Sequence, residues 1–213
     1  MKKIIRSIVI IAILVSAIGA QAQDDFEKNM YVSYDVGAVF QQDANVSQSF
    51  GSNGKVSFYP GARLDVGIGY NFCNWLAADV SGGFMWNSIN TFNGVSLSSI
   101  NQDVNIYSFP ILVGLTLKLP NRTHFIPYVG VSGGANISEF YLSDNGTSGN
   151  DHDVEPALQA EAGLNYVFNP SASLGLDYKF MTTLDQQYHI NGNSITQSGI
   201  YIHGIFIDLS VNF

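Results

Sequence analysis

The feature that most constrains this chain is the alternation of apolar and polar residues over its last ten positions. Counting back from the end, every second residue is apolar, and the residues between them are mostly polar or small. The apolar set comprises Phe213, Val211, Leu209, Ile207 and Ile205. Because successive side chains of a β-strand point to opposite faces, the pattern predicts a strand with one apolar and one polar face.

The same alternation recurs in seven further segments, so the sequence predicts eight strands. They cover Tyr31–Gln41, Tyr59–Tyr70, Trp75–Trp86, Val104–Leu117, Phe125–Ile137, Ala157–Phe168, Ala172–Thr182 and Ile200–Phe213. Each segment is long enough for a tilted strand that crosses a bilayer, which takes roughly 9–11 residues.

The connections between these segments alternate between short turns and long polar stretches. The long ones, rich in Ser, Asn and Gly, are Gln42–Phe58, Asn87–Asp103, Ser138–Pro156 and Thr183–Gly199. This order is typical of barrels with short periplasmic turns and longer outer loops. We therefore predict an all-β fold, an eight-stranded antiparallel transmembrane β-barrel with four longer extracellular loops.

A soluble barrel or sandwich would show the same alternation, with the apolar face as its core. Aromatic residues at the strand ends favour the membrane, because aromatic girdles mark both membrane interfaces of such barrels. On the periplasmic side they are Tyr31, Tyr70, Phe72, Trp75, Phe125, Tyr166, Phe168 and Phe213. On the outer side they are Phe40, Tyr59, Trp86, Tyr107, Phe109, Tyr178, Phe180 and Tyr201.

Residues 1–22 have the features of a secretory signal peptide. A basic start at residues 2–6 and the apolar stretch Ile8–Val15 precede a small-x-small site, Ala20-Gln21-Ala22. We expect cleavage after Ala22, which makes residues 23–213 a single outer-membrane barrel domain. A retained anchor is the alternative, although the apolar stretch is shorter than the roughly 20 residues of a spanning helix.

Charge and cysteine content exclude several classes of protein. Removal of residues 1–22 leaves six Lys and Arg against 17 Asp and Glu, a net charge of −11. Nucleic-acid binding requires a basic surface, so we exclude it. The rest of the chain has no run of 18 apolar residues, which excludes a helical membrane protein. Cys73 is the one cysteine, so no intrachain disulfide forms; it is a small turn residue or, alternatively, a reactive thiol.

Three stretches carry a family resemblance: Phe109-Pro110-Ile111-Leu112, the segment Pro127–Gly134, and the terminal Phe213. With them the chain resembles small outer-membrane β-barrels such as OmpX and the OmpA transmembrane domain. It is most similar to the outer membrane protein beta-barrel, or porin-like, family of Bacteroidetes type. The resemblance implies a Gram-negative outer membrane as the location. It also implies that Phe213 is an assembly signal, recognised by the barrel-assembly machinery.

Eight charged residues fall on the polar face in the middle of the strands. They are Asp35, Arg63, Asp65, Asp79, Glu161, Asp177, Lys179 and Asp208. A charge that faces lipid at mid-depth would cost about 2–4 kcal/mol for Lys or Arg, so we expect all eight in the lumen. The two interpretations are a packed, salt-bridged lumen charge network and a narrow gated channel. Six acids against two bases do not balance, so bound water or protonated carboxyl groups are required.

Two other constellations offer weaker candidates for chemistry. The third outer loop holds acidic residues that could bind Ca²⁺, but their spacing does not match an EF-hand. They are Glu139, Asp144, Asp151, Asp153 and Glu155. A hydrolase would need a histidine close to a nucleophile and an acid, and of four histidines only His203, near Ser198, lies on a predicted strand at the outer rim. We predict neither catalytic residues nor a cofactor or metal site.

We interpret the protein as an outer-membrane barrel with a structural or surface-interaction role through its extracellular loops. The alternative is a small-solute, porin-like channel, and a further alternative is a lipid-modifying enzyme. The expected partners are outer-membrane lipid, the assembly machinery and an unknown extracellular ligand; we expect a monomer.

The fourth predicted strand breaks the pattern. Val104 and Ile106 share one parity, whereas the apolar residues from Phe109 onward take the other. Pro110 lies at the switch and has no N–H for the ladder. A β-bulge would explain both facts, so we predict a bulge or a local loss of pairing within about two residues of Pro110. Alternatively, Val104 and Ile106 belong to the end of the loop.

Overall fold

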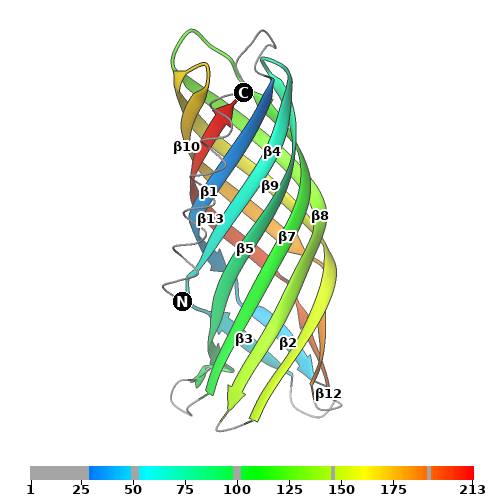
Figure 1. Ribbon diagram of the computed structural model, residues 1–213. Coiled ribbons are helices and arrows are strands. Elements are labelled where there is room, and N and C mark those ends of the chain that lie inside the picture. The colour runs from blue at the N-terminus through cyan, green and yellow to red at the C-terminus, as the bar shows by residue number, and fades with distance from the viewer. Residues whose placement is uncertain (1–28, 49–52, 98–101, 145–146, 191–192) are drawn as a thin grey trace.

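The chain folds into a closed barrel of eight antiparallel strands, and the predicted fold is confirmed (Figure 1). The computed structural model describes residues 29–48, 53–97, 102–144, 147–190 and 193–213. Within these residues the barrel strands are β1 (Met30–Gln41), β4 (Gly61–Cys73), β5 (Leu76–Phe92), β7 (Gln102–Lys118), β8 (Phe125–Asp144), β9 (Thr147–Asn169), β10 (Ala172–Thr183) and β13 (Tyr201–Asn212). Each pairs with the next in this order, and β13 returns to β1.

Pairing between β1 and β13 closes the wall. Their register runs from Tyr31 opposite Asn212 to Gln41 opposite Ile202. Just beyond this ladder, the amide of Phe213 donates a hydrogen bond of 2.9 Å to the carbonyl of Met30. Closure leaves no sheet edge in the hydrocarbon, where an unpaired backbone group would cost several kcal/mol. The described part of the chain contains no helix that is long and apolar enough to span a membrane.

The alternation separates a lipid-facing surface from the lumen. In β1, Val36 is 58 % exposed, whereas the neighbouring Asp35 is 7 % exposed. Exposed large apolar residues on all eight strands form the outer surface, as a lipid-facing wall requires. The aromatic residues predicted at the interfaces are mostly exposed on this surface, but Tyr31 is not. Its ring points inward and is 8 % exposed, so Tyr31 fills the lumen and does not belong to the girdle.

All four predicted outer loops contain strand residues: β5, β7, β8 and β9 continue into two of them and extend the wall, and three of the loops contain separate short strands. These are β2 (Ala44–Gln48), β3 (Gly54–Phe58), β11 (Gln186–Ile190) and β12 (Asn193–Ser198), with the short β6 (Val95–Ser96) beside β5. The β2–β3 and β11–β12 hairpins are joined through β12 and β2, and β3 pairs with the outer part of β5. We call these four strands with the outer part of β5 the outer annex; it lies at the end of the barrel away from the C-terminus (Figure 1).

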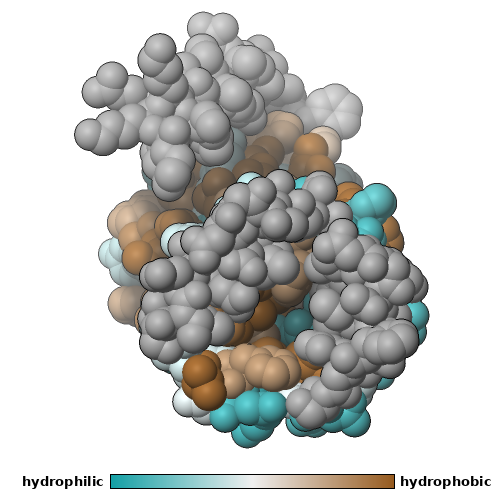
Figure 2. Space-filling model, turned by 90° about the horizontal axis from the view of Figure 1, so that it is seen from below, coloured by the Kyte–Doolittle hydropathy of each residue, from teal (hydrophilic) through white to brown (hydrophobic). Residues whose placement is uncertain are grey.

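A small apolar cluster holds the outer annex together. Ala44, Val46 and Val56 are buried, and three partly buried residues pack against them: Phe58, Ile89 and Phe92. Seen from the outer end, hydrophilic residues occupy parts of the rim, and apolar residues lie on the side of the wall (Figure 2). These segments were expected to be polar loops because the strands are short and only weakly alternating.

The local loss of pairing predicted at Pro110 is confirmed on one side of β7, although no bulge forms there. β7 pairs with β8 in one register along its whole length. Its pairing with β5 also keeps one register but is interrupted at Phe109 and Pro110, in keeping with the missing N–H of proline. Val104 and Ile106 are 6 % and 4 % exposed, so they face the lumen. The sequence pattern therefore changes because the lumen becomes apolar there, while the strand continues unchanged.

Lumen-facing glycines lie opposite large lumen-facing side chains on the neighbouring strand. A Cβ atom at Gly130 would lie 2.6 Å from the Glu161 carboxylate, and one at Gly163 would lie 2.5 Å from the Tyr128 ring. Both glycines are direct register partners of these residues. The same relation holds for Gly37 and Phe206, Gly69 and Tyr31, Gly83 and Asp65, and Gly114 and Asp79. Glycine at these positions leaves room for its partner to lie across the narrow lumen.

Replacing Gly83 by Val will destabilise the barrel, because the new Cβ would meet the Asp65 carboxylate and lie 3.1 Å from the Pro110 ring. Overpacking of this kind costs about 1–3 kcal/mol, so the urea midpoint of the refolded protein should fall. Gly82→Val is the matched control: Gly82 faces outward, a Cβ at this position would have no atom within 4 Å, and the midpoint should not fall. Equal midpoints for the two variants would contradict the spacing role of Gly83.

Candidate functional site

All eight charged residues singled out in the sequence lie on the lumen side of the wall. Asp79 and Glu161 line a cavity inside it. The other six are buried: Asp35, Arg63, Asp65, Asp177, Lys179 and Asp208. They come from β1, β4, β10 and β13, which are consecutive around the barrel. The register sets Asp35 directly between Asp65 on one side and Asp208 on the other, so three carboxyl groups form a row.

Lys179 is the centre of the lumen charge network. Its Nζ atom lies 3.2 Å from Asp35 Oδ2 and 3.3 Å from Asp65 Oδ2, and 3.8 Å from Asp177 Oδ2. The side chain is 7 % exposed, so these pairs are shielded from bulk water. Two of the three carboxylates come from other strands. Lys179 therefore ties β10 to β1 and β4 across the lumen.

Arg63 forms the second cationic centre. Its Nε atom donates to Asp65 Oδ1 at 2.8 Å, so Asp65 binds both Arg63 and Lys179. The aromatic ring of Phe206 lies beside both cations, with the Arg63 Cζ atom 5.7 Å and the Lys179 Nζ atom 4.8 Å from its centroid. Cations are attracted to the face of an aromatic ring, which adds to the ion pairs here. Gly37, directly opposite Phe206, leaves room for the ring.

The ion pairs of Lys179 and the position of Lys118 complete the description of the lumen cations. Glu161 is the register partner of Lys179, yet the ion pairs of Lys179 in the described residues are with aspartates only. Lys118 is a lumen cation that had been expected in a turn. Its Nζ atom donates to Asn71 Oδ1 at 2.7 Å and lies 5.2 Å from the Tyr31 ring centroid. Lys118 lies two positions after the inward-facing Thr116, so the alternation along the strand could have placed its side chain in the lumen.

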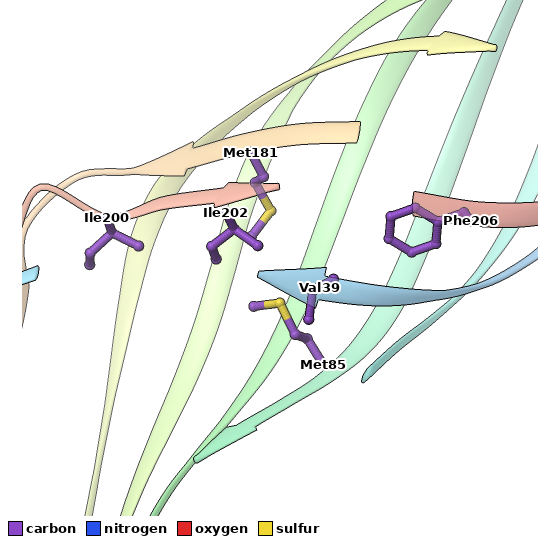
Figure 3. Packing of buried hydrophobic residues seen from close by; sticks show 6 residues of the cluster. All are labelled: Val39, Met85, Met181, Ile200, Ile202 and Phe206. Atoms are coloured by element: carbon purple, nitrogen blue, oxygen red, sulfur yellow. The ribbon is translucent and has the colours of Figure 1, made fainter. Parts of the chain in front are cut away.

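An apolar layer, contributed by four of the eight barrel strands, packs inside the lumen on the outer side of the charged groups. Figure 3 shows side chains from β1, β5, β10 and β13, with Ile200 just before β13, gathered inside the barrel. They are Val39, Met85, Met181, Ile200, Ile202 and Phe206, and each is 1–4 % exposed. The Met181 sulfur also accepts a contact of 3.5 Å from Arg63 Nη1, which joins this layer to the network. The layer was not predicted from the sequence, because only polar residues were expected to face the lumen.

A second polar layer lies beyond the apolar one. Asn87 donates to Gln41 Oε1 at 3.0 Å. Glu155, expected in an acidic outer loop, is instead a buried lumen residue of β9 that accepts 2.8 Å from the Ser138 hydroxyl. The Asp153 carboxylate accepts a hydrogen bond of 2.6 Å from the backbone amide of Gln187 and so attaches β11 to β9. The described residues contain no group of three or more His, Cys, Asp or Glu placed to hold a metal ion.

Within the described residues, the candidate catalytic His203 has other hydrogen-bond partners than a hydrolase requires. His203 Nδ1 lies 2.5 Å from the Tyr178 hydroxyl, and its Nε2 lies 2.7 Å from Gln42 Nε2. Both ring nitrogens are therefore used by residues that are neither a serine nor an acid. His203 also lies against the ring of Phe180, with 5.1 Å between centroids, as an interface residue would.

Arg63→Ala should lower the urea midpoint of the refolded barrel. The substitution leaves Asp65 with a single cation in a buried setting, and breaking a buried pair from one side costs about 3–5 kcal/mol. Lys55→Ala is the matched control, because Lys55 pairs with Asp43 at 3.0 Å on the exposed outer annex, where an ion pair contributes about 0–1 kcal/mol. A midpoint for Arg63→Ala no lower than that of Lys55→Ala would show that the pair does not stabilise the barrel.

Comparison with solved structures shows the same fold. OprG, an outer membrane protein of Pseudomonas aeruginosa, has a TM-score of 0.64 at 16 % identity, covering 87 % of this chain and 97 % of that chain. Neisserial surface protein A has a TM-score of 0.54 at 17 % identity, covering 86 % and 97 %. Outer membrane protein AlkL, determined in lipid bilayers, has a TM-score of 0.51 at 18 % identity, covering 90 % and 93 %. At these identities the likeness concerns the fold alone.

The sequence family supplies the remaining evidence. No curated protein sequence matches the chain. The family described as "Outer membrane protein beta-barrel domain" matches residues 9–213, which is nearly the whole sequence. The closed wall, its apolar outer surface and its polar lumen are those of such a domain. The chain therefore belongs to the outer membrane protein beta-barrel domain family and is a transmembrane protein of the bacterial outer membrane.

Proposed function

We propose that this small outer-membrane barrel does not conduct solutes and that it acts through its outer end, in a structural or surface-interaction role. The observation that carries the proposal is the burial of lumen-facing side chains. In an open channel, Met85, Met181 and Phe206 would contact water, but they are only 1–2 % exposed. Eight strands enclose an interior that side chains can fill, and here buried apolar side chains occupy part of it.

The outer annex supports the second half of the proposal. Its hairpins are paired with each other and with β5, and the Asp153–Gln187 contact attaches them to β9. A paired, apolar-packed surface binds a partner with less loss of conformational entropy than four free loops would. The extracellular ligand is unidentified.

The alternatives have weaker support. A porin-like channel needs an open polar path, whereas the side chains of the apolar layer are buried inside the lumen. A lipid-modifying enzyme needs a nucleophile and an acid near His203, which contacts Tyr178 and Gln42 instead. We extend the proposal to biogenesis: residues 1–22 act as a cleaved signal peptide, and Phe213 serves recognition by the assembly machinery.

Conductance of the purified, refolded barrel tests the closed lumen. In planar lipid bilayers the wild-type protein should give no stable conductance steps. The double variant Met85→Ala/Met181→Ala shortens two side chains of the apolar layer and should introduce a measurable leak. Ile205→Ala, on the lipid-facing side of β13, is the control and should stay closed. Stable steps in the wild type, unchanged by the double variant, would favour the porin-like alternative.

The role of Phe213 can be separated from its contribution to closure. Phe213→Ala keeps the backbone amide that donates to Met30 but removes the ring. We expect slower membrane assembly in cells for this variant, with little change in the urea midpoint of the protein refolded in detergent. Normal assembly of Phe213→Ala, combined with a lowered midpoint, would assign the ring a structural role only.

A further inference from the structure

The lumen is not completely filled. A cavity of about 70 Å³ lies in its periplasmic half, between the charged network and the inward-pointing rings of Tyr31 and Tyr128. A volume of this size holds a few water molecules or one small hydrated ion. The cavity is thus large enough for a ligand yet far too small for an organic solute.

The wall of this cavity carries more negative than positive charge: it has four carboxyl groups, from Asp35, Asp79, Glu161 and Asp208, against the amino groups of Lys118 and Lys179. Among its carboxylates, Asp35 is paired with Lys179. Asp79, Glu161 and Asp208 also line it, and none of the three has an ion-pair partner in the described part of the chain. Their register partners on one side are glycines, namely Gly114, Gly130 and Gly175, which provide space and no donor.

Two residues with neutral amide oxygen atoms also line the cavity. Gln159 lines the cavity and is 7 % exposed, and its Oε1 atom has no hydrogen-bond donor. Asn165 also lines the cavity, and its Oδ1 atom lacks a donor as well. A buried acceptor without a donor is costly, so each such atom in a native structure requires a partner. Unfilled acceptors beside carboxylates without an ion pair suit a positively charged partner.

We propose that this cavity binds a hard divalent cation, of the Mg²⁺ or Ca²⁺ kind, together with part of its hydration shell. Hard cations take oxygen ligands, and oxygens of Asp79, Glu161, Asp208 and Gln159 surround the space. The described carboxylates do not converge as a group of three on one point, so water molecules bridge some of them to the ion. With four carboxylates against two lysines the lining has a formal charge of −2, which one divalent ion offsets. This inference does not depend on the role of the outer annex.

Terbium luminescence tests the proposal directly. Tb³⁺ replaces hard divalent cations and emits when a nearby excited tyrosine transfers energy to it, and Tyr31 and Tyr128 line the cavity. The chain from Gln23 onward would be refolded in zwitterionic detergent with a chelator, the chelator would be removed, and the protein would then be titrated with Tb³⁺. We expect saturable tyrosine-sensitised emission that Ca²⁺ or Mg²⁺ displaces, whereas Na⁺ at equal ionic strength does not.

Variants locate the site. Glu161→Gln and Asp208→Asn keep side-chain size and remove charge, and together they should weaken Tb³⁺ binding at least tenfold. Asp43→Asn and Asp153→Asn remove acids outside the cavity and should leave the sensitised emission unchanged. Emission that is absent in the wild type, or equally strong in the double variant, would overturn the proposal.

A second measurement does not require any variant to fold. Thermal unfolding of the wild-type barrel would be compared in Mg²⁺, Na⁺ and tetramethylammonium salts at equal ionic strength. We expect the highest midpoint in Mg²⁺, because a ligand that binds only the folded state stabilises it. Equal midpoints in the three salts would mean that protons or water alone balance these carboxylates, and would refute the cation site.

Discussion

The structure depends on one constraint: lipid offers no hydrogen-bond partner to the backbone. Each N–H and C=O group in the hydrocarbon must therefore be satisfied within the wall, which only a closed sheet achieves for strands. The β1–β13 ladder supplies this closure, and it joins the first and last strands of the barrel. Such closure requires pairing between strands that are far apart in the sequence, so contacts between neighbouring strands alone cannot complete the fold.

The lumen solves a different problem, because charged and apolar side chains must share one narrow interior. Charged groups occupy its middle, apolar side chains follow on the outer side, and amide and hydroxyl groups lie beyond them. Phe206 sits at the boundary between the first two layers, where its ring faces Lys179 and Arg63 and packs with Val39 and Met181. An aromatic ring suits this boundary because it is apolar in bulk yet attracts cations at its face.

The barrel strands could be predicted from sequence because lipid imposes a period of two on their outer face. The predicted start of β8 at Phe125 and of β10 at Ala172 agrees with the structure. The lumen was less predictable, since its residues need only fit one another. Val104 and Ile106 were therefore misread as a break in parity, and Tyr31 as an interface residue. The partners of Lys179 depend on register across several strands, which no local pattern encodes.

The pairing of small with large residues in the lumen has a consequence for folding fidelity. A strand that slips by two positions keeps its apolar face toward lipid, so the outer surface cannot detect the error. Packing in the lumen does depend on the register. In the native alignment of β8 with β9, Tyr128 lies opposite Gly163. A slip of two in either direction would set Tyr128 against Glu161 or Asn165, and two bulky groups would compete for the same space. Packing in the lumen thus selects the native strand register, which the lipid-facing surface does not distinguish from a register shifted by two residues.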